Sequence, residues 1–283
     1  KYGLNFKAFE ASKSIGGNCR TIDIDAFKFD TGAHRFHDKI PKVTQEIKLL
    51  MGKELLKVSS PSKIYYNGNF LNFPIRISDL FKVFDFKTIS VITKELFKNQ
   101  VYSNKGDDNF RSFAYNTYGK TLSDLFIINY TKKLWGLSPE FLMKEVSGGR
   151  LDNLNLFNVI KEKIWINNSS THLDGLFYYP RNGYGSIFDK IKDTISPNHF
   201  YLNSPITKLV HNDKKIKKII YNNGQVLSPK KIICTLPITS IIKILEPQSN
   251  NKILDLGKAL SFRSLKLCIF IINKKYVSKN ASI

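Results

Sequence analysis

Residues 4–37 read LNFKAFEASKSIGGNCRTIDIDAFKFDTGAHRFH, and this stretch decides the fold. Leu4 to Phe9 alternates apolar and polar residues, which is typical of a β-strand, and the strand ends at Glu10. An acid at the carboxyl end of the second strand of a dinucleotide-binding sheet accepts hydrogen bonds from the ribose hydroxyls. The stretch therefore predicts an α/β domain that binds a dinucleotide.

Two glycine-containing segments follow that strand. The pair Gly16-Gly17 lacks Cβ atoms, so its backbone could approach a pyrophosphate, although a Gly-Gly pair is also common in ordinary turns. The runs TIDID and FKFD are expected to pair as a hairpin, after which Gly32 permits backbone to approach a ring system. His34 then either faces a cofactor ring or is an ordinary loop histidine. His34 and His37 have no third ligand at a suitable spacing, so no metal site is predicted.

The composition indicates a folded chain. Its 283 residues include 21 Phe and 13 Tyr and are 42% hydrophobic, enough for about two domains. The net charge of +21 comes mostly from lysines spread along the chain, which indicates biased codon usage rather than nucleic-acid binding. Attraction of an anionic substrate, or contact with a membrane surface, stays open.

The ends and the cysteines carry further expectations. The chain begins at Lys1 without Met and stops soon after an apolar run, so we expect a fragment that lacks both ends. No apolar run reaches the ~20 residues that span a bilayer, and no signal peptide is visible. Three cysteines (Cys19, Cys234 and Cys268) show neither a disulfide framework nor zinc spacing, so a cytoplasmic, possibly membrane-associated location is the default.

The middle of the chain is expected to be mainly helical. Residues 41–52 predict a helix with Val43, Ile47 and Leu50 on one face, and Asn67-Gly68 predicts a hairpin with a type I′ turn. Residues 78–168 then show helical periodicity, which indicates an inserted substrate or cap domain. It contains the string YTKKLWG, in which Gly136 ends a helix after Trp135.

At Phe177 the pattern returns to strands. FYYPRNGYGSIFDK predicts a strand, a turn and a helix capped by Gly185 or Ser186. Strands are expected at 206–210, 217–221 and 225–227, with a buried apolar strand at 231–235 and another strand from residue 260.

The ordered set FEAS, IGGN and FDTGAHRFH resembles the flavin amine oxidase superfamily, in the branch of protoporphyrinogen oxidase-like proteins and UDP-galactopyranose mutases. YTKKLWG and the YPRNGYG turn are similar to segments of the same branch. The resemblance covers nearly the whole chain. The family's GxGxxG turn would lie before Lys1, and its C-terminal Gly-Asp flavin segment is also absent, which fits a fragment. Without that first strand and turn, we expect residues 1–283 alone not to retain FAD.

The resemblance implies FAD as the cofactor and a split Rossmann-like FAD domain with an inserted helical domain. The cofactor-binding residues that it implies are Glu10, Ser12, Gly16, Gly17, Asn18, Gly32, His34 and Ile206. The substrate-binding residues that it implies are Trp135, Arg150 and Arg181. No catalytic residue is assigned, because the flavin performs the chemistry.

The expected domains are an FAD-binding part at 1–75, a helical substrate domain at 76–175, a second FAD-binding part at 176–245, and the start of a second substrate segment at 246–283. The expected function is an FAD-dependent oxidoreductase that transfers a hydride from an organic substrate to flavin. One alternative is a nucleotide-sugar isomerase that resembles the galactopyranose mutases, although Leu134 stands where those enzymes usually have Gln. A further alternative is a nucleotide-binding module without catalysis.

Overall fold

A computed structural model describes residues 3–72, 77–101, 106, 109–147, 175–212, 215–222 and 224–274. The chain divides into two compact units. Unit 1 comprises Lys1–Phe36, Ile40–Leu56 and Tyr179–Phe270, and unit 2 comprises His37–Lys39, Lys57–Tyr178 and Ile271–Ile283. Among the described residues, no helix is both long and apolar enough to cross a membrane.

The N-terminal part of unit 1 is built from short strands. Strand β1 (Ala8–Phe9) pairs in parallel with β8 (Phe200–Tyr201), so the predicted strand from Leu4 is shorter than expected. The predicted hairpin is present as β2 (Thr21–Ile24) and β3 (Phe27–Asp30), which pair antiparallel. Between β1 and this hairpin, Gly17–Cys19 forms a single 3-10 turn, η1.

Helix α1 (Pro41–Met51) packs against α8 (Ser186–Thr194) in unit 1. The predicted start at Pro41 is confirmed, and Gly52 ends the helix with φ 54°. The predicted apolar face is only partly right, because Thr44 and Met51 are buried whereas Val43 is 45% exposed. The face that packs is rotated toward the threonine, whose hydroxyl donates to the carbonyl of Ile40.

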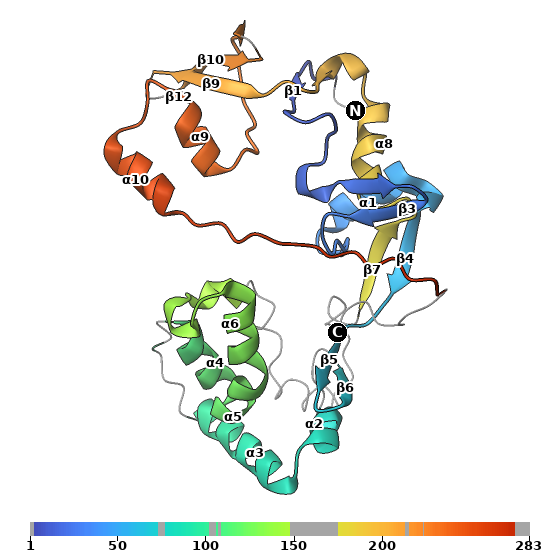
Figure 1. Ribbon diagram of the computed structural model, residues 1–283, viewed down its shortest axis with the longest axis vertical. Helices are drawn as coiled ribbons and strands as arrows, with labels where there is room; N and C mark the ends of the chain where they lie inside the picture. Colours follow the sequence, from blue (N-terminus) through green and yellow to red (C-terminus); the bar gives the residue numbers. More distant parts are fainter. Residues whose placement is uncertain are drawn as a thin grey trace. The chain divides into compact units, whose positions relative to one another are not determined.

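The C-terminal part of unit 1 contains a four-stranded sheet in the order β11-β10-β9-β12 (Figure 1). Strands β9 (Ile206–His211), β10 (Ile216–Tyr221) and β11 (Gln225–Leu227) are antiparallel, close to the predicted ranges, and β12 (Leu245–Glu246) runs parallel to β9. Helix α9 (Ile238–Ile244) packs on β9, and α10 (Asn251–Ala259) packs on α9. A 3-10 turn, η6 (Pro197–His199), precedes β8.

Two predicted strands are wrong in this structure. Residues 231–235 have no regular secondary structure and are exposed, with Ile233 at 95%, and residues 260–272 are extended without a strand partner among the described residues. Both segments are strongly apolar. A strand also needs backbone hydrogen-bond partners, and neither segment pairs with a described strand.

Two strands continue from one unit to the other. Strand β4 (Leu55–Ser59) pairs with β7 (Leu176–Pro180), and each strand begins in one unit and ends in the other. Just before β4, a 3-10 turn, η2 (Gly52–Glu54), follows α1.

Unit 2 begins with the predicted hairpin of β5 (Lys63–Tyr66) and β6 (Asn69–Asn72). Asn67 and Gly68 have φ of 46° and 79°, as a type I′ turn requires. The hairpin lies in unit 2. It is joined to α2 (Ile77–Val83), where the buried carboxylate of Asp79 accepts hydrogen bonds from the backbone and side-chain nitrogens of Asn72.

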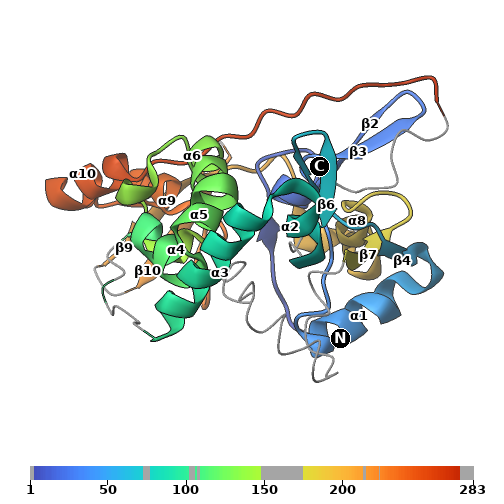
Figure 2. The ribbon, with the colours of Figure 1, turned by 90° about the horizontal axis from the view of Figure 1, so that it is seen from below.

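The described residues between 77 and 147 are mainly helical, as the periodicity predicts. Figures 1 and 2 show α3, α4, α5 and α6 packed together, and contacts between these elements agree. The elements are α3 (Phe86–Val101), α4 (Phe110–Tyr118), α5 (Lys120–Leu122), the π-helix η3 (Ser123–Ile128), α6 (Asn129–Trp135), and the 3-10 turns η4 (Pro139–Phe141) and η5 (Lys144–Ser147). Two hydrophobic clusters form the core, one around Ile92 and Leu122 and the other around Phe110 and Ile128. The predicted helix after residue 150 lies outside the described residues.

Candidate functional site

The site is built from the end of β1 outward. The amide of Glu10 donates to the carbonyl of Tyr201 at 2.9 Å, and the carbonyl of Glu10 accepts from the amide of Ser204 at 2.8 Å. Ser204 comes two residues before Ile206, the first residue of β9. The structure therefore brings Glu10 close to Ile206, the two residues expected on the adenosine side of a dinucleotide.

Glu10 also organises the residues that follow it. Its Oε1 atom accepts a hydrogen bond from the amide of Ser12 at 2.8 Å, and the Ser12 hydroxyl donates to the carbonyl of Ser14 at 2.6 Å. The carbonyl of Ser12 accepts from the amide of Asn203 at 3.0 Å. These bonds fix the turn and leave Oε2 as the carboxylate oxygen for a ligand.

The glycine pair has the backbone that only glycine adopts readily. Gly16 and Gly17 both have positive φ, at 106° and 53°. A Cβ on Gly16 would touch the ring of Phe188 at 3.4 Å, whereas a Cβ on Gly17 would meet no atom within 4 Å. The backbone of Gly17 is therefore open to a ligand, while Gly16 packs against α8.

Asn18 connects the glycine pair to the histidine loop, residues 31–34. Its carbonyl accepts a short hydrogen bond from the hydroxyl of Thr31, and the amide of Thr31 donates to the carbonyl of Arg20 at 3.2 Å. Hydrogen bonds thus link the segment of the glycine pair to the histidine loop within unit 1.

Gly32 lies against the ring of His34, whose Nε2 lies 3.3 Å from a Cβ built on Gly32. The amide of His34 donates to the carbonyl of Gly32 at 2.9 Å, which closes a tight turn. The ring of His34 also lies 5.1 Å from the ring of Tyr184.

Asp30, which we did not select from the sequence, is the most connected polar residue of the site. Its side chain is 5% exposed and accepts three hydrogen bonds: from the Thr21 hydroxyl at 2.6 Å, the Tyr179 hydroxyl at 2.6 Å and the Tyr184 amide at 3.0 Å. A signal was present, since Asp30 ends the strand FKFD directly before the histidine loop. Two of its partners, Tyr179 and Tyr184, are more than a hundred residues away in the chain and could not be read from the sequence.

The return turn, residues 180–185, owes its glycines to Thr21. A Cβ on Gly183 would lie 2.4 Å from the Thr21 hydroxyl, and a Cβ on Gly185 would lie 2.5 Å from the Thr21 amide nitrogen. The Gly185 amide donates to that hydroxyl at 2.8 Å. Gly185 is the N-cap residue of α8, as predicted, but close packing against β2 is what excludes larger residues.

The two tyrosines of this region have perturbed ionisation. Burial, and next the hydrogen bond to Asp30, raise the pKa of Tyr179 well above its ordinary 10.0. Burial and the nearby Cys19 and Asp30 also raise the pKa of Tyr184. Both phenols therefore stay protonated at neutral pH, and that of Tyr179 donates to Asp30.

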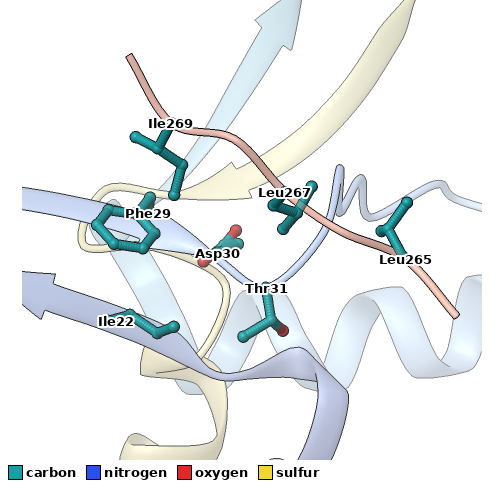
Figure 3. Close-up of a pocket in the computed structure, with 7 residues that line it drawn as sticks. All are labelled: Ile22, Phe29, Asp30, Thr31, Leu265, Leu267 and Ile269. Atoms are coloured by element: carbon teal, nitrogen blue, oxygen red, sulfur yellow. The ribbon is translucent and has the colours of Figure 1, made fainter. Parts of the chain in front are cut away.

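A cavity of about 240 Å³ lies beside this cluster in unit 1 (Figure 3). Hairpin residues line one side, and the extended segment after α10 lines the other. The lining residues are Ile22, Phe29, Asp30, Thr31, Leu265, Leu267 and Ile269. Most of the lining is aliphatic or aromatic, and the oxygens of Asp30 and Thr31 are engaged in the bonds described above.

Of the residues predicted to bind substrate, Trp135 lies in unit 2 and Arg181 lies in the return turn. In unit 2, Trp135 ends α6, where it packs on the cluster that contains Phe110 and Ile128, and Gly136 supplies the left-handed cap with φ 68°. In unit 1, the exposed Arg181 donates its amide to the carbonyl of Glu54 at 2.8 Å. Arg150 lies outside the described residues.

Comparison with known proteins gives a family match and fold matches. Residues 2–270 match the model of flavin containing amine oxidoreductases. No curated protein matches the chain.

Several solved structures share the fold. A reduced UDP-galactopyranose mutase is 19% identical with a TM-score of 0.72, covering 90% of this chain and 55% of its own. A putative protoporphyrinogen oxidase from Exiguobacterium sp. 255-15 is 14% identical (TM-score 0.62, 89% and 58% covered), and cyclohexylamine oxidase from Brevibacterium oxydans IH-35A is 16% identical (TM-score 0.57, 90% and 58% covered). The chain thus spans a little over half the length of these structures, and the likeness establishes an FAD-binding, Rossmann-like α/β fold.

Proposed function

Because this chain belongs to the flavin containing amine oxidoreductase family, whose cofactor is FAD, we propose that the protein is an FAD-dependent oxidoreductase. In this proposal an organic substrate gives a hydride to the flavin. Bound FAD would supply the electron-accepting chemistry, and the chain would supply binding, orientation and exclusion of water.

The adenosine half of FAD would lie along Glu10, Ser12 and Ile206. The open Oε2 of Glu10 suits the ribose hydroxyls, since a carboxylate can accept from both. Gly17 and Asn18 would approach the pyrophosphate, because the backbone of Gly17 has no atom within 4 Å on its Cβ side. The carboxylate acceptor of Glu10 and the open backbone of Gly17 fit the adenosine and pyrophosphate parts of FAD.

The flavin half would lie beside Gly32 and His34. The histidine loop is short, fixed at Thr31 and Asp30, and carries a ring that could border the isoalloxazine. On the substrate side we propose Trp135, Arg150 and Arg181, with residues 76–175 as the substrate domain and 1–75 with 176–245 as the two FAD-binding parts.

One observation carries this proposal: the backbone bonds of Glu10 to Tyr201 and Ser204, which hold the acid close to Ile206 at the start of β9. The experiment is to purify the full-length protein and measure its FAD content and FAD dissociation constant. Glu10→Gln is expected to weaken FAD binding about tenfold, the value of a charge-assisted hydrogen bond. Glu246→Gln, an exposed partner of Lys208, is the matched control. A wild-type protein without FAD would refute the proposal.

The second candidate is a nucleotide-sugar isomerase similar to the galactopyranose mutases. The strings IGGN, GAHRFH and YTKKLWG favour it, whereas Leu134 and the YPRNGYG turn favour the oxidase-like branch. Incubating the full-length, chemically reduced protein with UDP-galactopyranose separates the two, because formation of the furanose isomer would exclude the oxidoreductase. A non-catalytic nucleotide-binding module would bind FAD, would not form the furanose isomer, and would not reduce its flavin with an organic substrate.

A further inference from the structure

The carboxylate of Asp30 lies next to the histidine loop and bonds to three segments: β2, β7 and the return turn. We propose that Asp30 is a positioning residue for this loop, acting on bound flavin through His34. The inference rests on the proposed function, and it assigns a role to a residue outside the predicted FAD contacts.

The geometry around Asp30 is that of a fixed anchor. Oδ1 accepts from the Thr21 hydroxyl and the Tyr184 amide, and Oδ2 accepts from the Tyr179 hydroxyl. These partners belong to β2, the return turn and β7. Hydrogen bonds to a charged, buried acceptor are stronger than neutral ones, so one side chain holds three segments in register.

His34 is the group through which this anchor reaches the cofactor. Its Nδ1 is buried without a hydrogen-bond partner and lies 3.9 Å from Oδ2 of Asp30, about 1 Å beyond bonding distance. The ring is bounded on its other sides by Gly32, through Nε2, and by the ring of Tyr184. The orientation of the imidazole therefore depends on Asp30 and its partner Tyr184 together.

The charge of the carboxylate is what this position needs. The Tyr184 amide can only donate, whereas the hydroxyls of Thr21 and Tyr179 can also accept, so the Asn of Asp30→Asn can still bond these groups. Asp30→Asn nevertheless replaces charge-assisted hydrogen bonds with weaker neutral ones and forces the Tyr179 hydroxyl to reverse its role. Tyr179→Phe removes a single donor and keeps the carboxylate, which makes it the milder variant if Asp30→Asn folds poorly.

The first test measures opening of the histidine loop by proteolysis, a readout that does not depend on flavin binding. Trypsin cleaves after Arg35, one residue beyond His34, and cleavage in the native full-length protein requires the loop to open. We expect cleavage at Arg35 to be about tenfold or more faster in Asp30→Asn, and faster to a smaller extent in Tyr179→Phe. Tyr65→Phe, which removes an exposed hydroxyl from β5, should leave the rate unchanged. Unchanged cleavage in Asp30→Asn would overturn the inference alone.

The second test asks whether Asp30 acts through His34. FAD dissociation constants are measured for Asp30→Asn, His34→Ala and the double variant. Both single variants should bind FAD about tenfold more weakly, and the double variant should be no weaker than the weaker single one. If the fold-losses in FAD affinity of the two single variants multiply in the double variant, the two residues act independently and the inference is overturned. A wild-type protein without FAD would overturn the proposed function and this inference with it.

Discussion

Gly185 is constrained by a neighbour rather than by its own φ. A Cβ at this position would lie 2.5 Å from a backbone nitrogen, which cannot rotate away as a side chain can. We expect Gly185→Ala to lower the free energy of unfolding by about 1–3 kcal/mol, the usual cost of overpacking, measured by urea denaturation. Gly68→Ala meets no atom within 4 Å and should cost only the ~1–2 kcal/mol of a left-handed alanine. Equal unfolding midpoints for wild type and Gly185→Ala would show that the contact yields freely.

Tyr179 couples stability to alkaline pH. Its pKa is raised in the folded state by burial and by Asp30, so the folded chain keeps a proton that the unfolded chain releases above pH ~10. The stabilisation is complete below that pH and is lost as pH rises through the folded pKa. We expect the urea midpoint of wild type to fall with pH above ~10, and that of Tyr179→Phe to fall less steeply. Parallel curves would contradict the assignment.

At the scale of single residues, the sequence predicted conformation better than contact. The positive φ of Gly17, Gly68 and Gly136 follows from their turn and cap positions, and the structure has it. The reasons for Gly32, Gly183 and Gly185 were not predictable, because they lie in the ring of His34 and in the side chain and backbone of Thr21, which approach only after folding.

Among the elements, the hairpin β5-β6 and helix α2 depend on one buried carboxylate. Asp79 is fully buried and bonds both the backbone of Asn72 and the ammonium of Lys82. Asp79→Ala leaves these partners without an acceptor and should cost about 3 kcal/mol in the free energy of unfolding. Asp85→Ala removes an exposed cap on the Thr88 amide and should lower the urea midpoint less than Asp79→Ala does. Similar losses for both variants in urea denaturation would refute the ranking.

Elements with a local signal were predicted well, and elements that need a distant partner were not. The hairpins, α1 and the helices of unit 2 follow from turn residues and periodicity within short windows. The apolar runs 231–235 and 264–272 carry the same composition as buried strands, yet the structure leaves them exposed. The composition of a segment shows that it is apolar. Whether it forms a strand depends on a partner strand elsewhere in the chain, which composition does not identify.

On the scale of the whole molecule, unit 2 is nearly continuous in sequence. Lys57–Tyr178 contains both hydrophobic clusters of its helices and the hairpin bound to α2. We expect residues 57–178, expressed alone, to be helical by circular dichroism and to unfold cooperatively in urea. A gradual, non-cooperative loss of signal would show that this segment needs unit 1 for its core.

Unit 1 has the opposite arrangement, and this affects how the protein is made. Ala8 pairs with Phe200, so β1 has no partner until β8 has been synthesised. During synthesis, the helices of unit 2 leave the ribosome before β8 does and can fold first, while β1 stays without its parallel neighbour. Chaperone dependence of newly made protein should therefore concentrate in β1, and slowing of translation after residue 201 would relieve it.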